Sequence, residues 1–327
     1  MGVLSFLFGS CQLLAEFMFN ILHFLGIYLR PQPDRNALLT GKTVIVTGCT
    51  RGIGKALLED LVRREAHVIM ACRDIDLATS IAKQFHEKYI ASKISVRRLD
   101  LASFASIKQF AKQVTQEEPM IHILVNNAGA MSSPERKETE DGNEWTIGVN
   151  YFGPVLLTLL LLPKIKEKIL FVGSSSHGFV ERIPFDDINS KKWVDGYMQS
   201  FITYAKSKAS LLCLCYPLAR KLYTNFGIKV YSVDPGVSDT DVTRDLPKLR
   251  SSNSNSLASR MATRTNGQSA DSIMHTILSQ SPYDPSVLHF RDGKPLATGS
   301  CTRDTRQQQD LWKMTRNVLD IDVMDKM

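Results

Sequence analysis

Cysteine is scarce in this sequence, with only six residues in 327. None of them forms a Cys-x-x-Cys pair, and no group of cysteine and histidine has the spacing of a zinc site. The six are Cys11, Cys49, Cys72, Cys213, Cys215 and Cys301. We therefore expect reduced thiols, no disulfide framework and no metal.

A strong charge of one sign is also absent. The chain has 40 Lys and Arg residues against 33 Asp and Glu, a net charge of +7. No nucleic-acid-binding motif or basic–aromatic stripe occurs, so nucleic acid is not expected as a partner. Hydrophobic residues make up 43% of the chain, which is typical of a folded globular protein and excludes wholesale disorder.

Charge is nearly missing from the first 29 residues. Between Val3 and Leu29 the only charged residue is Glu16, and Arg30-Pro31-Gln32-Pro33 then ends any helix. A helix of this length spans about 40 Å, enough for a tilted crossing, so residues 1–29 are predicted to form a membrane anchor. The central carboxylate leaves open a hairpin, an interfacial helix or an amphipathic helix packed on the domain, and a signal peptide is a further alternative.

After this segment, short apolar and β-branched runs alternate with stretches long enough for helices. The runs predicted as strands are Thr43–Thr47, Val68–Cys72, Ile94–Leu99, Ile121–Val125, Ile169–Val172, Lys229–Val233 and Ser286–Phe290. Because they lack polar alternation, they are expected to be buried on both faces. The predicted class is α/β, a single-domain, doubly wound parallel sheet between helix layers. Residues 30–40 are its linker, 41–300 the domain and 301–327 a C-terminal extension.

The first predicted strand runs directly into a glycine-rich turn, Thr47-Gly48-Cys49-Thr50-Arg51-Gly52-Ile53-Gly54, and a helix is expected from Lys55 to Arg64. Glycines at these places permit a tight turn, a close approach of backbone to a pyrophosphate, and close packing of helix on strand. The helix N-terminus adds amide donors and partial positive charge. In this context the pattern predicts a dinucleotide site.

The end of the second predicted strand indicates which dinucleotide is bound. A carboxylate there would bind the adenosine ribose and repel a 2′-phosphate, but Cys72 occupies that position. Arg73 beside it and Arg51 in the turn are suited to pair with a 2′-phosphate. We therefore expect a preference for NADP(H), with NAD(H) as the alternative.

Tyr204 and Lys208 lie four residues apart in Tyr-Ala-Lys-Ser-Lys, on one face of a predicted helix. A phenol with a pKa of about 10 is a poor base at neutral pH, and a nearby ammonium is expected to lower that pKa. Tyr204 would then exchange a proton with an alcohol or a carbonyl while hydride moves to or from nicotinamide.

Together these motifs resemble the short-chain dehydrogenase/reductase superfamily, whose fold is of the Rossmann type, over residues 41–300. The further segments that carry the resemblance are Asp100-Leu101, Asn126-Asn127-Ala128-Gly129, Asn150 in Gly-Val-Asn-Tyr-Phe-Gly, Ser174-Ser175-Ser176, and Pro235-Gly236 with Thr240.

The resemblance implies a role for each of these residues. Ser175 would hydrogen-bond the substrate oxygen, with Ser174 and Ser176 as alternatives for that serine. Lys208 would also bind the nicotinamide ribose, and Asn150 would pass protons onward through water. The residues expected to contact the cofactor are Thr47, Gly48, Arg51, Gly52, Ile53, Gly54, Arg73, Asp100, Leu101, Asn127, Ala128, Gly129, Tyr204, Lys208, Pro235, Gly236 and Thr240.

Within the superfamily, Ala71-Cys72-Arg73-Asp74, Ile183-Pro184-Phe185 and the apolar N-terminus resemble the membrane-bound retinol dehydrogenase branch. Val233-Asp234-Pro235-Gly236-Val237 and Gln307-Gln308-Gln309-Asp310-Leu311-Trp312 are more similar to its polyprenol dehydrogenase relatives. The branch implies an NAD(P)-dependent alcohol dehydrogenase or carbonyl reductase for a lipophilic substrate similar to retinol or polyprenol. It also implies the endoplasmic reticulum membrane, and the arginines after the apolar segment favour a cytosolic domain.

One alternative of another class stays open at this point. A catalytically idle nucleotide-binding or scaffold protein would have the same fold. A homo-oligomer is compatible with the sequence, which does not specify the oligomeric state.

Overall fold

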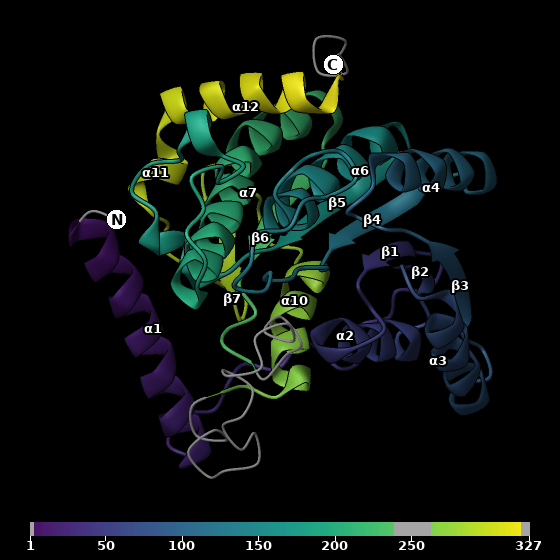
Figure 1. Cartoon of the computed structure of the whole chain (residues 1–327). Helices are drawn as coiled ribbons and strands as arrows, with labels where there is room; N and C mark the ends of the chain where they lie inside the picture. Colours follow the sequence, from purple (N-terminus) through teal and green to yellow (C-terminus); the bar gives the residue numbers. More distant parts are fainter. Residues whose placement is uncertain (1–2, 239–262, 322–327) are drawn as a thin grey trace.

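The computed structural model describes residues 3–238 and 263–321, and its centre is one eight-stranded sheet (Figure 1). The strand order is β3-β2-β1-β4-β5-β6-β7-β8, and all neighbours are parallel except β7 and β8. The strands are β1 (Thr43–Thr47), β2 (His67–Cys72), β3 (Lys93–Arg98), β4 (Ile121–Asn126), β5 (Ile165–Val172), β6 (Lys229–Val233), β7 (His289–Arg291) and β8 (Lys294–Pro295). This confirms the predicted doubly wound parallel sheet. The order reverses between β1 and β4, which is where open parallel sheets bind ligands at their carboxyl ends.

Two layers of helices cover the sheet. One layer contains α2 (Gly52–Arg63), α3 (Ile75–Lys88) and α10 (Asn266–Leu278), and the other contains α4 (Phe104–Glu117), α6 (Gly153–Leu161) and α7 (Tyr197–Phe226). Alternate side chains of β1 enter the two cores, since Ile45 packs under the second layer while Val44 and Val46 pack under the first.

The remaining helical segments of the domain connect these layers or pack on their outer side. They are α5 (Trp145–Ile147), the π-helical turn η1 (Gly148–Phe152), η2 (Leu162–Lys164), η3 (Ser175–Phe179), η4 (Phe185–Asp187), α11 (Ser300–Arg303) and α12 (Thr305–Leu319). Both α11 and α12 pack on α7 (Figure 1), so the described part of the C-terminal extension lies against the domain.

Two strands begin three or four residues away from the predicted start, and the other predicted strand boundaries agree within one residue. β5 begins at Ile165, earlier than predicted, because a buried Lys168 donates to the Ile277 carbonyl at 2.6 Å and neutralises the carboxyl end of α10. β7 begins later than predicted, because Asp284 Oδ1 accepts from both the amide and the hydroxyl of Ser286 and closes a turn there.

The N-terminal helix α1 (Val3–Phe24) lies against the domain beside η3 (Figure 1). An ideal Cβ on Gly9 would lie 2.7 Å from the Phe179 ring, so the backbone of α1 approaches η3 closely. Among the described residues, Leu4–Phe24 and Trp145–Lys164 are long and apolar enough to cross a membrane. The second of these segments is 83% buried and is a core helix of the domain.

Candidate active site

The glycine-rich turn connects β1 to α2 at the carboxyl end of the sheet. Gly48 has a φ of +65°, and an ideal Cβ there would lie 2.9 Å from Ala128 Cα. A Cβ on Gly54 would collide with the Gly48 carbonyl oxygen. Gly52, Ile53 and Gly54 form the first turn of α2, whose N-cap residue makes no side-chain capping hydrogen bond. The first amides of α2 are therefore not capped by the N-cap side chain, and the turn before them requires glycine for its close packing.

Polar side chains bind this turn to the end of β4. Asn127 Nδ2 donates to the carbonyls of Thr47 and Gly48 at 2.9 and 3.1 Å. In return, the Ala128 amide donates to Thr47 Oγ1 at 2.9 Å. These contacts fix the predicted cofactor residues of the two strands against each other.

The end of β2 carries no free carboxylate. Cys72 is 4% exposed, and its Sγ lies 3.4 Å from that of Cys49 in the turn. Asp74, the nearest acidic residue, accepts from the Leu77 amide and caps α3. The Arg73 side chain is exposed at this end, as is that of Arg51.

The segment after β3 has a structural contact of its own. Asp100 Oδ1 accepts from the Ala102 amide at 3.0 Å, and the Leu101 side chain is buried. Both residues follow the carboxyl end of β3, on the same edge of the sheet as the glycine-rich turn.

Tyr204 and Lys208 project from α7 toward the end of β5. Lys208 Nζ lies 5.7 Å from the centre of the Tyr204 ring and donates to the Val172 carbonyl at 2.8 Å. Ser174 lies close enough to the Tyr204 phenol for its hydrogen bonding to lower the phenol pKa. The structure thus brings the predicted tyrosine and lysine together with the serine that precedes the predicted Ser175.

Burial controls the protonation of both groups. It raises the pKa of Tyr204 to about 12, despite the opposing hydrogen bond from Ser174. Burial also lowers the pKa of Lys208 to about 8. The phenol pKa is therefore raised and not lowered as expected, because the loss of water around Tyr204 is the largest influence on it. The phenol is an acid at neutral pH.

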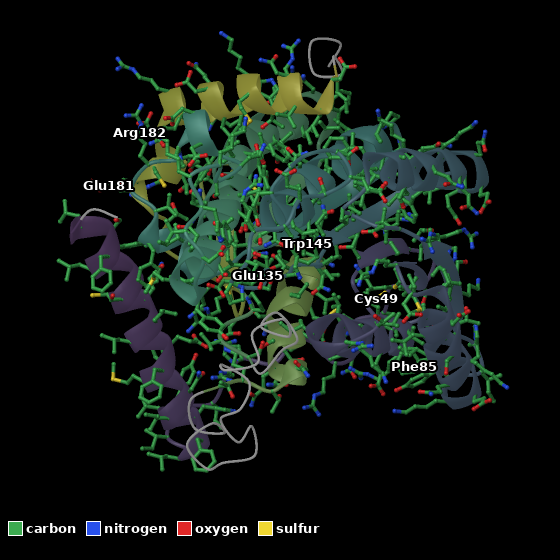
Figure 2. The ribbon with its side chains drawn as sticks, viewed as in Figure 1. Cys49, Phe85, Glu135, Trp145, Glu181 and Arg182 are labelled. Carbon is green, nitrogen blue, oxygen red and sulfur yellow. The ribbon has the colours of Figure 1, made fainter. Side chains whose placement is uncertain are left out.

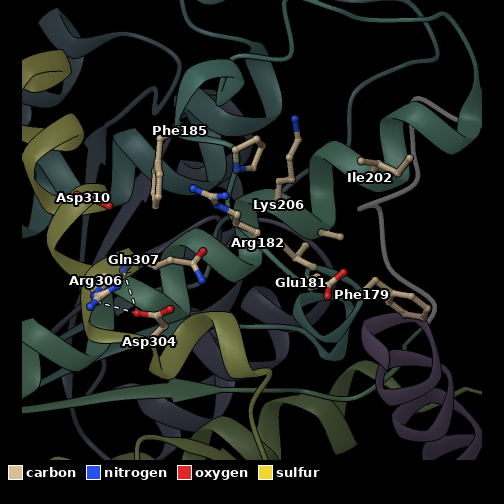
Figure 3. Close-up of a pocket in the computed structure, with 13 residues that line it drawn as sticks. Phe179, Glu181, Arg182, Phe185, Ile202, Lys206, Asp304, Arg306, Gln307 and Asp310 are labelled. Carbon is tan, nitrogen blue, oxygen red and sulfur yellow. Dashed lines mark hydrogen bonds between the residues drawn. The ribbon is translucent and has the colours of Figure 1, made fainter. Parts of the chain in front are cut away.

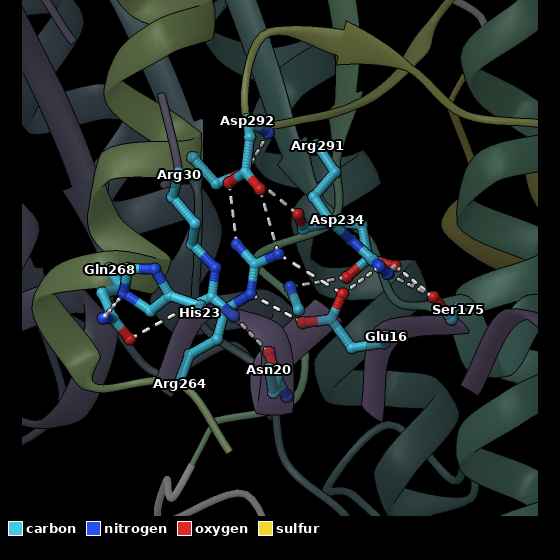
Figure 4. Close-up of polar contacts among 12 residues, drawn as sticks. Glu16, Asn20, His23, Arg30, Ser175, Asp234, Arg264, Gln268, Arg291 and Asp292 are labelled. Atoms are coloured by element: carbon cyan, nitrogen blue, oxygen red, sulfur yellow. Dashed lines mark hydrogen bonds and ion pairs between the residues drawn. The ribbon is translucent and has the colours of Figure 1, made fainter. Parts of the chain in front are cut away.

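Ser175 faces a different set of partners. Its hydroxyl donates to Asp234 Oδ2 at 2.6 Å and accepts from Arg291 Nη2 at 2.6 Å (Figure 4). Asp234 is buried, which raises its pKa, but Arg291 and the other polar neighbours outweigh this and hold the pKa well below its usual range. Asp234 therefore carries a negative charge that is matched by Arg291.

Asn150 lies in the π-helical turn η1 near Lys208. Its Oδ1 accepts from the Ala130 amide at 2.9 Å, and its Nδ2 donates to Ser207 Oγ at 3.1 Å. An ideal Cβ on Gly129 would lie 3.3 Å from Lys208 Nζ and 3.7 Å from Asn150 Oδ1. A side chain at residue 129 would therefore crowd these two polar groups, and π-helical turns are frequent at functional sites.

The segment after β6 completes the site. The Gly236 amide donates to Asp234 Oδ1 at 2.8 Å with a φ of +78°, and Pro235 precedes it in a buried position. A Cβ on Gly236 would lie 2.6 Å from Glu16 Oε1 of α1. Thr240, the remaining predicted cofactor residue, lies outside the described residues.

The sequence analysis did not identify the charged cluster around Ser175. Arg291 binds both Asp234 and Glu16, and Arg264 binds both Glu16 and Asp292 (Figure 4). Two sequence features belong to this cluster: Glu16 is the lone carboxylate in an apolar segment, and Asp234 directly follows a buried strand. Neither indicates a partner by sequence spacing, because the five residues come from α1, β7 and three connecting segments.

A cavity of about 740 Å³ opens on another face of α7 (Figure 3). Ile202, Ala205 and Lys206 line it, together with charged residues that include Arg182 and Asp304. Tyr204 and Lys208 do not line this cavity, since they lie on a different face of the helix. We therefore place the candidate active site at the carboxyl end of the sheet and not in this cavity.

The residues present fit a nicotinamide dinucleotide. The first turn of α2, without a side-chain cap, offers amides for a pyrophosphate, and Gly48 and Gly54 let this turn pack directly against Ala128 and its own backbone. The gap at Gly129 lies between Lys208 and Asn150. Among the described residues, no group of three or more His, Cys, Asp and Glu side chains is arranged to hold a metal.

Comparisons with known proteins agree with this geometry. The model of the short chain dehydrogenase family matches residues 42–185. Retinol dehydrogenase 12 of Mus musculus is 34% identical over 293 residues, which cover 88% of this chain and 89% of that protein. Polyprenol dehydrogenase of Danio rerio is 32% identical over 86% of this chain and 87% of its own length. A crystal structure of an uncharacterized protein from Mycobacterium Paratuberculosis has a TM-score of 0.70 and 26% identity, covering 88% of this chain and 96% of that one.

Proposed function

Since this chain belongs to the short-chain dehydrogenase/reductase family, in its retinol dehydrogenase-like branch, we propose that it interconverts a lipophilic alcohol and its aldehyde or ketone with NADP(H). One observation supports this most directly. The Tyr204 phenol meets the Ser174 hydroxyl at the carboxyl end of the sheet, with Lys208 Nζ 5.7 Å from the phenol ring. The lipophilic substrate class rests on the relatives, which are named for retinol and polyprenol.

Tyr204 carries the proton in this proposal. In the reducing direction its protonated phenol gives a proton to the carbonyl oxygen, and in the oxidising direction it takes one from the alcohol. The Ser174 hydroxyl, hydrogen-bonded to the phenol, donates to the same substrate oxygen and stabilises the charge that develops there. A bound nicotinamide supplies or accepts the hydride.

Lys208 stabilises the phenolate that remains after Tyr204 has given its proton. The Val172 carbonyl holds Nζ on the side of the tyrosine ring, from which a second N–H can reach the nicotinamide ribose. We assign Asn150 to proton relay, because it lies next to Lys208 across the Gly129 gap. Ser175 is assigned to positioning, because Asp234 and Arg291 already occupy its hydroxyl.

We place the cofactor along the carboxyl end of the sheet, with its pyrophosphate and its nicotinamide held by different segments. The first turn of α2 binds the pyrophosphate, and the Asn127–Gly129 segment and Pro235-Gly236 flank the nicotinamide. Arg51 and Arg73 bind a 2′-phosphate, which favours NADP(H). Two facts support this preference: Cys72 provides no carboxylate to repel the phosphate, and Asp74 is engaged in capping α3.

The proposed location is the endoplasmic reticulum membrane, with the domain in the cytosol. Support comes from the apolar α1 and from the basic Arg30 and Arg35 that follow it. A lipophilic substrate dissolved in a membrane would reach an enzyme bound to the same membrane directly.

A substrate screen tests the proposed function. Purified full-length protein would be assayed with retinaldehyde, a polyprenal and a short aldehyde, each with NADPH and NADH. We expect turnover of the lipophilic aldehydes and a kcat/KM with NADPH about tenfold or more above that with NADH. Arg73→Ala should narrow this ratio, while Arg182→Ala, which changes an exposed arginine elsewhere, should leave it unchanged. Absence of hydride transfer with every carbonyl would contradict the proposal, and an NADH preference would contradict the role of the arginines.

A further inference from the structure

Helix α1 presents a polar and small-residue stripe to the domain. Ser5, Gly9, Gln12, Glu16 and Asn20 follow one another at spacings of three or four residues, so they share one face of the helix. Four of them are buried and Gln12 is partly buried. The side of α1 that touches the protein is therefore its polar side.

Each part of this stripe has a partner on the domain. Gly9 lies against the Phe179 ring, and Gln12 Nε2 donates to the Ala297 carbonyl at 3.0 Å. Glu16 is 1% exposed and forms ion pairs with Arg264, at 2.7 Å, and with Arg291 (Figure 4). Specific polar contacts therefore hold α1 along most of its length.

The opposite face of α1 is apolar and exposed to the surroundings. Figure 2 shows its side chains projecting away from the domain. Its large side chains are Leu4, Phe6, Leu7, Leu14, Phe17, Met18, Phe19 and Phe24, between 40% and 78% exposed. Large exposed apolar side chains continue beyond the helix at Leu25, Ile27 and Leu29. No exposed residue from Leu4 to Leu29 carries a formal charge.

This arrangement is the reverse of a helix packed on a water-soluble domain, which buries its apolar stripe and exposes its polar one. An outer surface free of charge suits hydrocarbon, where an unpaired charge is costly. We propose that α1 lies in the plane of a lipid bilayer, with its apolar face in the hydrocarbon and its polar stripe docked on the domain. The proposal deepens the membrane association of the proposed function, on which it rests.

The buried ion pairs distinguish this arrangement from a helix that spans the membrane. Spanning would pull Glu16 away from both Arg264 and Arg291 and would leave its carboxylate without its two ion-pair partners. A second copy of the chain or a protein partner fits the outer face less well, because such interfaces have a polar rim and this face has none.

Aromatic rings also connect α1 with α7. Phe6 of α1 contacts Phe179 with ring centres 6.0 Å apart, and Phe179 contacts Phe201 of α7 at 5.4 Å. Phe201 lies one turn before Tyr204 on the same helix. These ring contacts link the lipid-facing helix to the helix that carries the proposed proton donor.

Vesicle flotation tests whether the outer face binds lipid. The full-length protein would be synthesised in a cell-free system with sealed phosphatidylcholine vesicles and then floated on a density gradient. We expect the wild type to float, and Leu14→Glu with Phe17→Glu to reduce the floating fraction about tenfold. Ile90→Glu, at a 96% exposed apolar residue on the domain, is the matched control and should float as the wild type does.

Protease protection in the same vesicles tests the orientation. A cleavage site placed before Val3 should be cut from outside in intact vesicles, as should the domain. Protection of either one would show a spanning helix and overturn the proposal. Flotation unchanged by the double variant, or wild type that stays at the bottom, would also overturn it. Because neither readout involves turnover, a protein that floats in this orientation but reduces no lipophilic aldehyde would contradict only the proposed function.

Discussion

Two neighbouring serines after β5 have different surroundings, and their variants should differ accordingly. Ser174 contacts the Tyr204 phenol, whereas the Ser175 hydroxyl is held by Asp234 and Arg291. Ser174→Ala should lower kcat about a hundredfold, since it removes a donor to the substrate oxygen, and it should cost about 1 kcal/mol of stability because Ser174 Oγ also accepts from the Ser176 amide. Ser175→Ala should instead lower the free energy of unfolding by about 1–3 kcal/mol. Kinetics and denaturation of both variants check this, and a larger loss of kcat in the Ser175 variant would reverse the assignment.

The buried Tyr204 phenol predicts different pH profiles for the two directions of reaction. Because its pKa is raised to about 12, the group is protonated at neutral pH and ready to serve as an acid. Alcohol oxidation needs the phenolate, whose fraction grows about tenfold per pH unit below the pKa. The kcat/KM for reduction should be level from about pH 6 to 8 while that for oxidation rises. Oxidation that is independent of pH over this range would show that cofactor binding resets the phenol pKa.

At the scale of secondary-structure elements, the β1–α2 turn gives a test of cofactor binding. Gly54→Ala introduces a methyl group against the Gly48 carbonyl, which should displace the α2 amides and weaken NADPH binding about tenfold or more. Gly267→Ala is the matched control, because its Cβ meets only Thr265 Oγ1 at 3.9 Å on α10. Fluorescence titration with NADPH measures both. Equal affinities in the two variants would show that the turn does not hold the cofactor.

Elements with local signals were predictable from the sequence. The glycine-rich turn lies between a strand and a helix in the chain, and Tyr204 and Lys208 share one helix, so spacing alone predicts their proximity. The choice between Ser174 and Ser175 was not predictable. The direction of the Ser175 side chain is set by Asp234, which follows β6, and by Arg291 of β7. Both residues are distant from Ser175 in the sequence, so spacing gives no sign of these contacts.

At the scale of the whole molecule, the charged cluster that joins α1 to the sheet gives a stability test. Asp234→Asn removes one of the two carboxylates that pair with Arg291 and should lower the free energy of unfolding at pH 7 by about 3 kcal/mol. The pKa of Asp234 is depressed on folding, so its stabilisation is present above the unfolded pKa of about 4 and is lost as the pH falls below it.

The difference between the wild type and Asp234→Asn should therefore shrink below about pH 4. Urea denaturation across this range measures it, with Asp310→Asn as an exposed control. A difference that stays constant down to about pH 3 would mean that the carboxylate is not the source of the stabilisation.

The docking of α1 on the domain could also not be predicted from residue spacing in the sequence. Its composition indicates a membrane segment, and Glu16 marks it as unusual, but the partners Arg264 and Arg291 lie more than two hundred residues away along the chain. The sheet, by contrast, was predicted almost completely, because buried parallel strands are continuous apolar runs. Long-range charge pairing leaves no such periodic signal.

The most direct test of the account is the Tyr204→Phe variant in the full-length protein. NADPH binding, measured by fluorescence titration, should stay within about twofold of the wild type, since the phenyl ring still fills its place on α7. Reduction of a lipophilic aldehyde, followed by cofactor absorbance, should fall about a thousandfold because no group gives the proton. A variant that keeps about a tenth or more of the wild-type rate would show that Tyr204 is not the proton donor.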